Sequence, residues 1–223
     1  MPKTRIPWAQ YSINPVKGLC PVDCTDNNGK PYCYARKGYR RFKWNPEIRF
    51  EEIEMWWDIA ILCKGKRVFV GSTIELFGDW VKPEWQQAIF RHVARMTQHT
   101  FIFLTKMPQN LPREWPDNCW VGVSTPNASH ALKARKHMVS VHAKVKFLSI
   151  EPMFDWGIGY PTIWGILSNF QWVILGSRTQ PVRHPFEQEV RKIIEAADDL
   201  KIPVFVKEPL ATHLNIHREE YPK

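Results

Sequence analysis

The chain has 223 residues, and its 31 Lys and Arg outnumber its 22 Asp and Glu, which gives a formal net charge of +9. A hydrophobic fraction of 44% excludes a disordered or fibrous chain, and the length fits a single domain over residues 1–223. No signal peptide or long apolar run opens the chain, and the five cysteines are odd in number, so we expect a cytoplasmic protein with reduced thiols and no membrane segment. The positive charge favours an acidic partner such as nucleic acid or a phosphorylated cofactor.

Three cysteines follow a probable first strand over residues 11–14. Cys20, Cys24 and Cys33 fall within fourteen residues, in a loop that we place at 18–36. This spacing predicts a metal site of one of two kinds. Structural zinc needs four ligands, whereas three thiolates on a four-iron, four-sulfur (4Fe-4S) cluster leave one iron open for a small molecule. No histidine precedes His92, so the candidates for a fourth zinc ligand are Asp23, Asp26, Cys63 and Cys119.

A basic and aromatic stretch overlaps this loop. From Lys30 to Arg49 there are seven basic residues and one acidic residue, interleaved with Tyr32, Tyr34, Tyr39, Phe42 and Trp44. Positive charge combined with aromatic rings is typical of nucleic-acid contact. The alternative is a solvated helix face whose aromatic side chains pack into the core. The predicted nucleic-acid contacts are Arg36, Lys37, Arg40, Arg41 and Lys43.

The rest of the chain alternates short apolar runs with longer amphipathic stretches. Helices are predicted over 51–63, with Met55, Trp56, Ile59 and Leu62 as core, and over 85–98, 128–139 and 185–200. Further strands are predicted over 67–72, 100–106, 119–124, 145–151, 171–177 and 202–207. Continuous apolar strands separated by helices indicate a parallel sheet. No Gly-x-Gly-x-x-Gly turn follows a strand, so we expect an α/β fold of the partial TIM-like (β/α)6-7 barrel type rather than a Rossmann sheet.

Polar residues stand at the carboxyl ends of all seven predicted strands, where parallel barrels carry their chemistry. These residues are Asn14, Ser72, Lys106, Ser124, Glu151, Ser177 and Lys207. Glu151 and Lys207 each follow apolar residues directly, so each needs a partner. Either the two form an ion pair, or the carboxylate holds the amine or ribose hydroxyls of a ligand.

The cysteine trio and several strand motifs together resemble the radical S-adenosylmethionine (SAM) superfamily. Within it, the chain resembles a phage-associated uncharacterised family distantly similar to spore photoproduct lyase. The resemblance spans nearly the whole chain and rests on the segments Ser12–Gly18, Cys33–Ala35, Phe69–Ser72, Leu104–Lys106, Val121–Ser124, Leu148–Pro152 and Phe205–Glu208. Its commonest cysteine spacing is Cys-x-x-x-Cys-x-x-Cys, but here eight residues separate Cys24 from Cys33. Asp26 to Gly29 is a strong turn signal that could keep these cysteines close together.

The resemblance implies a radical SAM enzyme of the partial-barrel fold. Cys20, Cys24 and Cys33 would ligate the 4Fe-4S cluster, SAM would bind the open iron, and an external donor would supply electrons. Nucleic acid or a nucleotide is the expected substrate, although direct photoproduct repair is not expected, because no spare cysteine can be placed at the barrel mouth. The residues expected to bind the cofactor are Tyr32, Tyr34, Gly71, Ser72, Glu75, Lys106, Ser124, Glu151, Ser177 and Lys207.

Two other functions remain open from the sequence. The first is a non-catalytic, zinc-stabilised nucleic-acid-binding protein. The second is an enzyme on the same barrel whose substrate is a protein or small metabolite. The sequence specifies no oligomeric state.

Overall fold

The computed structural model describes residues 3–26, 28–52, 59, 62, 65–179 and 181–223. The chain divides into two compact units, here called unit 1 (residues 1–120) and unit 2 (residues 121–223). Each unit is described by itself. Strand β6 (Cys119–Ser124) begins in unit 1 and ends in unit 2.

All seven strands expected from the sequence are present. They are β1 (Tyr11–Ile13), β4 (Arg67–Val70), β5 (Thr100–Thr105), β6, β7 (Val145–Ile150), β8 (Trp172–Leu175) and β11 (Val204–Val206). Their order is β1-β4-β5-β6-β7-β8-β11, the order in which they occur in the chain. An order that never reverses is that of a TIM-like winding, whereas a Rossmann sheet has a reversal point. The expected α/β class with parallel strands is therefore confirmed.

In unit 1, β4 pairs in parallel with β1 and with β5, and Val68 is aligned with both Tyr11 and Phe101. Helix α3 (Pro83–Arg95) starts with Pro83 in its first turn, where a missing N–H costs nothing, and buries Ala88, Ile89 and Val93. A short 3-10 helix, η1 (Pro108–Asn110), follows β5. The side chains of β4 and β5 are mostly buried, as expected for a parallel sheet.

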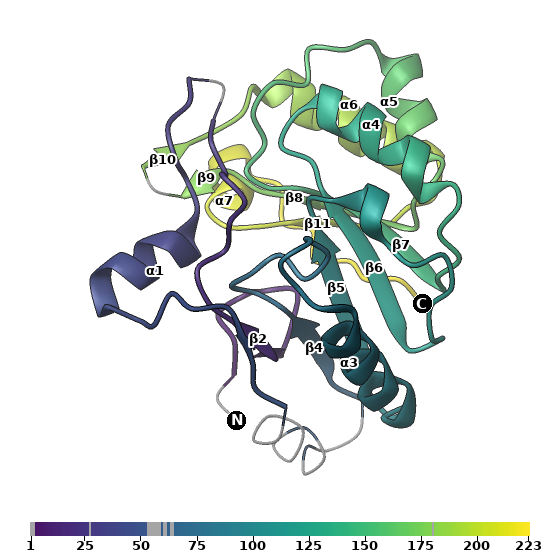
Figure 1. Ribbon diagram of the computed structural model, residues 1–223. Helices are drawn as coiled ribbons and strands as arrows, with labels where there is room; N and C mark the ends of the chain where they lie inside the picture. Colours follow the sequence, from purple (N-terminus) through teal and green to yellow (C-terminus); the bar gives the residue numbers. More distant parts are fainter. Residues whose placement is uncertain (1–2, 27, 53–58, 60–61, 63–64, 180) are drawn as a thin grey trace. The chain divides into compact units, whose positions relative to one another are not determined.

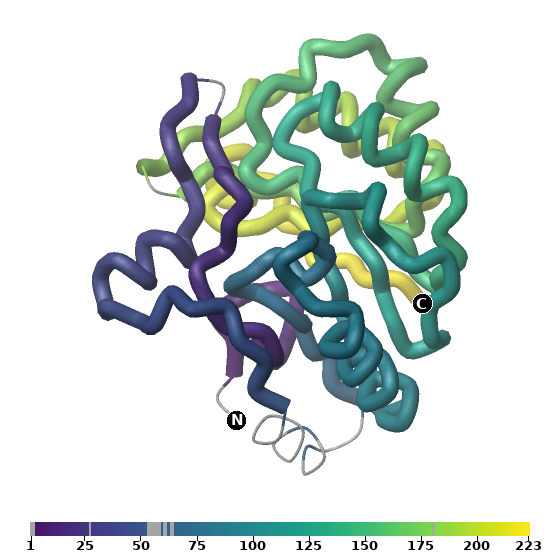
Figure 2. Tube along the Cα trace, in the orientation of Figure 1, coloured from purple at the N-terminus to yellow at the C-terminus, as the bar shows by residue number. Residues whose placement is uncertain are grey.

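In unit 1, the segment between two short strands, β2 (Val16–Lys17) and β3 (Arg49–Phe50), forms a long excursion from the sheet. The two strands pair antiparallel, and the backbone N–H of Leu19 donates to the carbonyl of Pro46 at 2.9 Å, so the excursion is closed at its base. Gly18 has φ +126°, and a Cβ on it would come within 2.6 Å of the Ile48 Cα, so only glycine fits there. Figure 2 shows the chain running out through residues 19–26 and coming back through residues 28–33 into helix α1 (Tyr34–Phe42).

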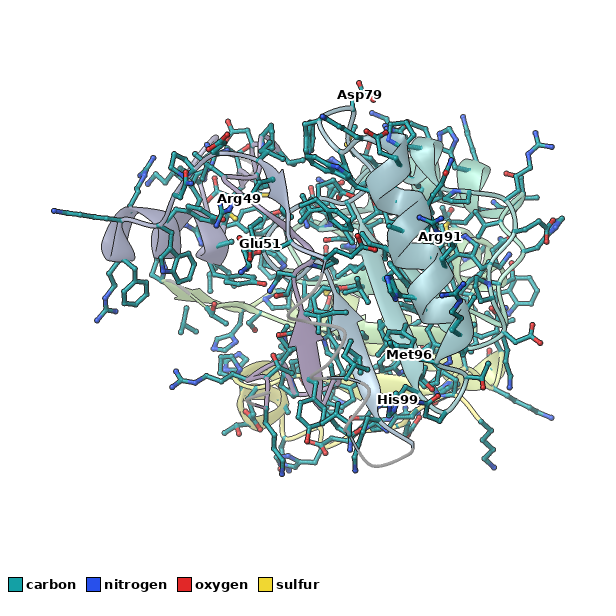
Figure 3. The ribbon with its side chains drawn as sticks, turned by 60° about the horizontal axis from the view of Figure 1, so that its bottom comes forward. Arg49, Glu51, Asp79, Arg91, Met96 and His99 are labelled. Atoms are coloured by element: carbon teal, nitrogen blue, oxygen red, sulfur yellow. The ribbon has the colours of Figure 1, made fainter. Side chains whose placement is uncertain are left out.

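An ion-pair network fixes the same base. Glu51 pairs with Lys17 and, at 2.9 Å, with Arg49, which lies beside it in Figure 3. The hydrogen bond from Lys17 and the positive charges of Lys17 and Arg49 lower the pKa of the Glu51 carboxyl. The excursion is therefore held in one place by backbone and side-chain bonds together.

In unit 2, β8 pairs in parallel with β7 and with β11. Helices α4 (Ala128–Met138), α5 (Tyr160–Leu167) and α6 (Glu187–Asp199) pack beside one another (Figure 1). A small antiparallel ladder, β9 (Arg178–Thr179) with β10 (Val182–Arg183), follows β8, and helix α7 (Leu210–Leu214) follows β11. The C-terminal segment runs along β11, where Phe205 bridges Glu219.

Three of the four predicted helices are confirmed, with ends shifted by a few residues, as α3, α4 and α6. The predicted helix over 51–63, with Met55 and Trp56, falls mostly outside the described residues. Helices α1, α5 and α7 were not predicted.

Candidate functional site

Two of the three cysteines of unit 1, Cys24 and Cys33, are brought together by a hairpin. Thr25 bridges Pro31 antiparallel, and the N–H of Tyr32 donates to the carbonyl of Cys24 at 3.0 Å. The buried Asp26 carboxylate closes the turn by accepting from the N–H groups of Asn28 and Lys30, each at 2.9 Å. The eight-residue spacer therefore forms the turn expected from the sequence, and it places Cys24 next to Cys33.

The thiols interact directly. The Cys24 thiol donates a hydrogen bond to Cys33, which lowers the pKa of Cys33 and raises that of Cys24, and Cys20 interacts electrostatically with both. The N–H groups of Ala35 and Arg36 in the first turn of α1, together with the charge of Lys106, also lower the pKa of Cys33. Burial raises the pKa of Cys20. The site thus favours a thiolate at Cys33.

Asn14 and Ser72, two of the predicted residues at the strand ends of unit 1, belong to one hydrogen-bond network. The Asn14 side-chain oxygen accepts from the Ser72 hydroxyl, the Thr73 hydroxyl and the Thr73 N–H, each at 3.1 Å. The Tyr34 hydroxyl donates to the carbonyl of Ser72. Gly71 turns the chain at φ +81°, a conformation that glycine adopts without strain. Asn14 thereby fixes the loop after β4, a role that its place at a strand end did not specify.

Glu75 is buried and its carboxylate is fully engaged. One oxygen accepts from the Thr105 hydroxyl at 2.7 Å and the Phe77 N–H at 3.1 Å, and the other accepts from the Lys106 N–H at 2.8 Å. The N–H of Glu75 donates to the Cys20 sulfur at 3.4 Å. Glu75 therefore connects the end of β5 to the first cysteine.

Tyr32 is half-buried beside the cysteines. Burial, with further contributions from Cys24 and Cys33, raises the pKa of its phenol. Of the predicted set, Tyr32 and Lys106 interact with Cys24 and Cys33, Glu75 contacts Cys20, and Tyr34 contacts Ser72.

Arg36 differs from the other basic residues of α1. Its guanidinium donates to the carbonyls of Cys20 at 3.1 Å and Val22 at 3.2 Å, and it pairs with Asp23 at 3.6 Å. The structure thus places Arg36 inside the cysteine loop, whereas Lys37, Arg40, Arg41 and Lys43 are exposed.

We expect Arg36→Ala to loosen the cysteine loop, because it removes both bonds that hold the backbone between Cys20 and Cys24. With the 4Fe-4S cluster expected from the sequence, the variant should retain less than half of the iron that wild type retains after anaerobic reconstitution and desalting. Arg91→Ala, an exposed change on α3 (Figure 3), serves as the control and should retain iron like wild type. Equal iron in wild type and Arg36→Ala would contradict this role.

The predicted residues of unit 2 form two groups of their own. Glu151, after β7, pairs with Lys207, after β11, and accepts from the Ser149 hydroxyl at 3.1 Å. Of the two arrangements expected from the sequence, an ion pair or a carboxylate that holds a ligand, the structure shows the ion pair. Ser177, after β8, contacts the Nδ1 of His184 at 2.8 Å, and the His184 ring stacks on His213 at 3.8 Å. Ser124 is buried at the end of β6. Sequence reasoning missed His184, which carries no motif and lies in a loop.

The candidates for a fourth zinc ligand are engaged elsewhere or poorly placed. Asp23 pairs with Arg36, Asp26 closes the hairpin turn, and Cys119 is fully buried at the start of β6. Cys63 lies outside the described residues. Over the part of the chain that the structure describes, no three His, Cys, Asp or Glu side chains are grouped to hold a single metal ion.

Comparison with protein families identifies the chain at the family level. Residues 3–214 match the family described as "Protein of unknown function (DUF5131)". The chain belongs to this family. No curated protein has significant similarity to the sequence.

Solved structures of spore photoproduct lyase share the fold. A point mutant of that enzyme matches with a TM-score of 0.61 and 11% identity, over 90% of this chain and 77% of the other. Its complex with dinucleoside spore photoproduct matches with a TM-score of 0.57 and 11% identity over the same shares. These matches support the partial TIM-like barrel class. Among the described residues, no helix is both long and apolar enough to cross a membrane.

Proposed function

We propose that the protein is a radical SAM enzyme whose 4Fe-4S cluster is ligated by Cys20, Cys24 and Cys33, and whose substrate is nucleic acid or a nucleotide. The observation that carries the proposal is the cysteine hairpin. The hairpin sets Cys24 beside Cys33 despite the long spacer, and hydrogen bonding with Cys24, the N–H groups at the start of α1 and the charge of Lys106 favour a thiolate at Cys33. Cysteines ligate metals as thiolates, so these features fit ligation of a 4Fe-4S cluster.

The donor set fits a cluster better than a single zinc ion. Zinc requires four ligands at about 2.0–2.3 Å from one point, and three of the four candidates for a fourth ligand serve other contacts or lie buried at a strand start. A cluster takes each thiolate on a different iron and needs no fourth protein ligand. With SAM on the open iron and an external electron donor, the cluster would supply reductive cleavage of the sulfonium and a 5′-deoxyadenosyl radical for hydrogen abstraction.

The residues around the cysteines have separable tasks in this proposal. The N–H of Glu75 donates to the sulfur of Cys20, an interaction that tunes cluster potentials. Tyr32 and Tyr34 supply aromatic surface next to the cysteines for the adenine, and Ser72 and Gly71 offer backbone groups for the methionine moiety. The unit 2 residues Ser124, Glu151, Ser177 and Lys207 stay sequence-based predictions for SAM binding, taken from their places at strand ends.

The proposal of a nucleic-acid or nucleotide substrate rests on helix α1. Its exposed basic residues follow the third cysteine directly, and a positive surface attracts phosphates. The dinucleoside bound by the solved relative supports the same substrate class. A protein or small-metabolite substrate has no comparable observation in its favour.

The test is iron and sulfide content of protein purified and reconstituted without oxygen, followed by assay of 5′-deoxyadenosine from SAM with a chemical reductant. We expect about four irons per chain for wild type. The Cys20→Ala, Cys24→Ala and Cys33→Ala triple variant should lose the iron and the cleavage activity, and Cys119→Ala is the matched control that keeps both. Stoichiometric zinc that iron cannot replace would contradict the proposal and favour a zinc-stabilised binding protein.

A further inference from the structure

Two aromatic side chains at the C-terminal end of α1 are stacked on each other in an exposed position. The rings of Phe42 and Trp44 have centroids 5.4 Å apart and an interplanar angle of 22°, and Tyr39 meets Trp44 edge-on at 5.3 Å. Phe42 is 58% exposed and Trp44 47% exposed. The pair is therefore ordered by ring contacts rather than by burial in a core.

The backbone is adapted to hold this pair. Gly38 lies inside α1, where glycine costs about 1 kcal/mol relative to alanine, and a Cβ there would come within 3.0 Å of the Trp44 ring. Lys43, between the two aromatics, has φ 50°, in the left-handed region that non-glycine residues rarely adopt. Gly38 therefore leaves room for the Trp44 ring against α1, and the left-handed turn at Lys43, which ends the helix, precedes Trp44.

Positive charge surrounds the pair. Lys37, Arg40, Arg41 and Lys43 are exposed, and the Arg41 guanidinium lies 5.3 Å from the centroid of the Phe42 ring. Within the described part of the chain, Arg40, Arg41 and Lys43 make no ion pair. Residues 27–46 include no acidic residue. The local charge is therefore available to an anionic partner.

We propose that Phe42, Trp44 and the basic residues around them form a stacking site for unpaired bases of single-stranded nucleic acid, here called the α1 platform. Ring faces stack on base faces, and the arginines and lysines contact phosphates. In a duplex the base faces are covered by their neighbours, so exposed ring faces favour an unpaired strand. An anionic membrane fits less well, because the nine-residue helix offers only these few apolar side chains for insertion.

The platform is connected to the cysteine site within unit 1. Cys33 precedes the first residue of α1, and the Tyr39 hydroxyl accepts a hydrogen bond from the Gly18 N–H at 2.8 Å. Figure 1 shows α1 at the edge of unit 1, away from β4 and β5. The inference rests on the proposed function for its link to catalysis, since the platform would hold the strand whose nucleotide reacts. Binding itself does not depend on that function.

The test is fluorescence anisotropy with a labelled single-stranded oligonucleotide of mixed sequence, the same oligonucleotide as a duplex, and vesicles containing phosphatidylserine. Phe42→Leu with Trp44→Leu keeps apolar volume but removes the ring faces. We expect this variant to bind the single strand at least about 10-fold more weakly, given the usual strength of base stacking, and to bind the duplex nearly as wild type does. Circular dichroism checks that the variant is folded, and Phe186→Leu, a change at an exposed aromatic in unit 2, is the matched control.

The charge contribution is tested separately. Arg40→Gln with Arg41→Gln should reduce the slope of log affinity against log salt by about 1, whereas Lys133→Gln with Lys136→Gln on α4 should leave it unchanged. Single-strand binding that survives loss of both rings, or vesicle binding in place of nucleic-acid binding, would overturn the inference. If the single strand binds through the platform but no iron or SAM cleavage is found, the proposed function fails and the platform stands.

Discussion

Replacing Glu75 by alanine is expected to lower the free energy of unfolding by about 3–5 kcal/mol. The reason is that three donors, two of them buried and one part-buried, lose their acceptor at once. They are the Thr105 hydroxyl, the Phe77 N–H and the Lys106 N–H. Urea unfolding followed by circular dichroism measures the change.

Two further variants make this prediction specific. Glu75→Gln keeps the volume but presents an NH2 group to one set of donors, so it should lose roughly half as much stability as alanine. Glu187→Ala removes an exposed pair with Arg191 four residues along α6 and should cost no more than about 0.5 kcal/mol. A Glu75→Ala loss as small as that of Glu187→Ala would show that Glu75 does not hold the loop together.

The same contacts predict an effect on the cysteine site. Because the Glu75 N–H donates to the Cys20 sulfur, movement of this loop withdraws a donor from the first cysteine. In the proposed enzyme, Glu75→Gln should therefore shift the reduction potential of the cluster while the iron content stays near that of wild type. An unchanged potential would limit Glu75 to a role in stability.

The main strands could be predicted because each is a run of apolar residues long enough to be buried on both faces. Val145 to Ile150 and Trp172 to Leu175 are examples, and the ends of both were predicted to within two residues. Helix α5 was missed because eight residues rich in apolar side chains, with Pro161 and Gly165, show no amphipathic period. Helix α1 was missed because it contains Gly38, a poor helix former, and buries few side chains. The Trp44 ring, which lies outside the helix, packs against it at Gly38.

The site was only partly accessible from the sequence. The spacing identified Cys20, Cys24 and Cys33, and the turn signal at Asp26 explained how a long spacer could keep them close. Charge alone assigned Arg36 to nucleic acid, because a sequence shows that a residue is basic but not which way its side chain points. The functions of Asn14 and Glu75 depend on contacts between separate strands, which no local pattern encodes.

Lys207→Met is expected to destabilise the protein by about 1–3 kcal/mol, because it removes the cation that pairs with the mostly buried Glu151 carboxylate. The value lies below the 3–5 kcal/mol of a fully buried pair, since the side chains of Lys207 and Glu151 keep 22% and 14% exposure. Glu151→Gln alone should cost less stability than Lys207→Met, because the charge it leaves without its partner is that of Lys207, the more exposed of the two side chains.

The double variant Glu151→Gln with Lys207→Met decides how the pair acts. If the cost of Lys207→Met arises from an unpaired carboxylate, neutralising Glu151 should recover at least half of it, which a double-mutant cycle in urea would show as a coupling of about 0.5–2 kcal/mol. Strict additivity would contradict the pairing. A double variant that regains stability but does not bind SAM would show that the ion pair also holds the cofactor. That role is the one predicted from the positions of Glu151 and Lys207 after β7 and β11.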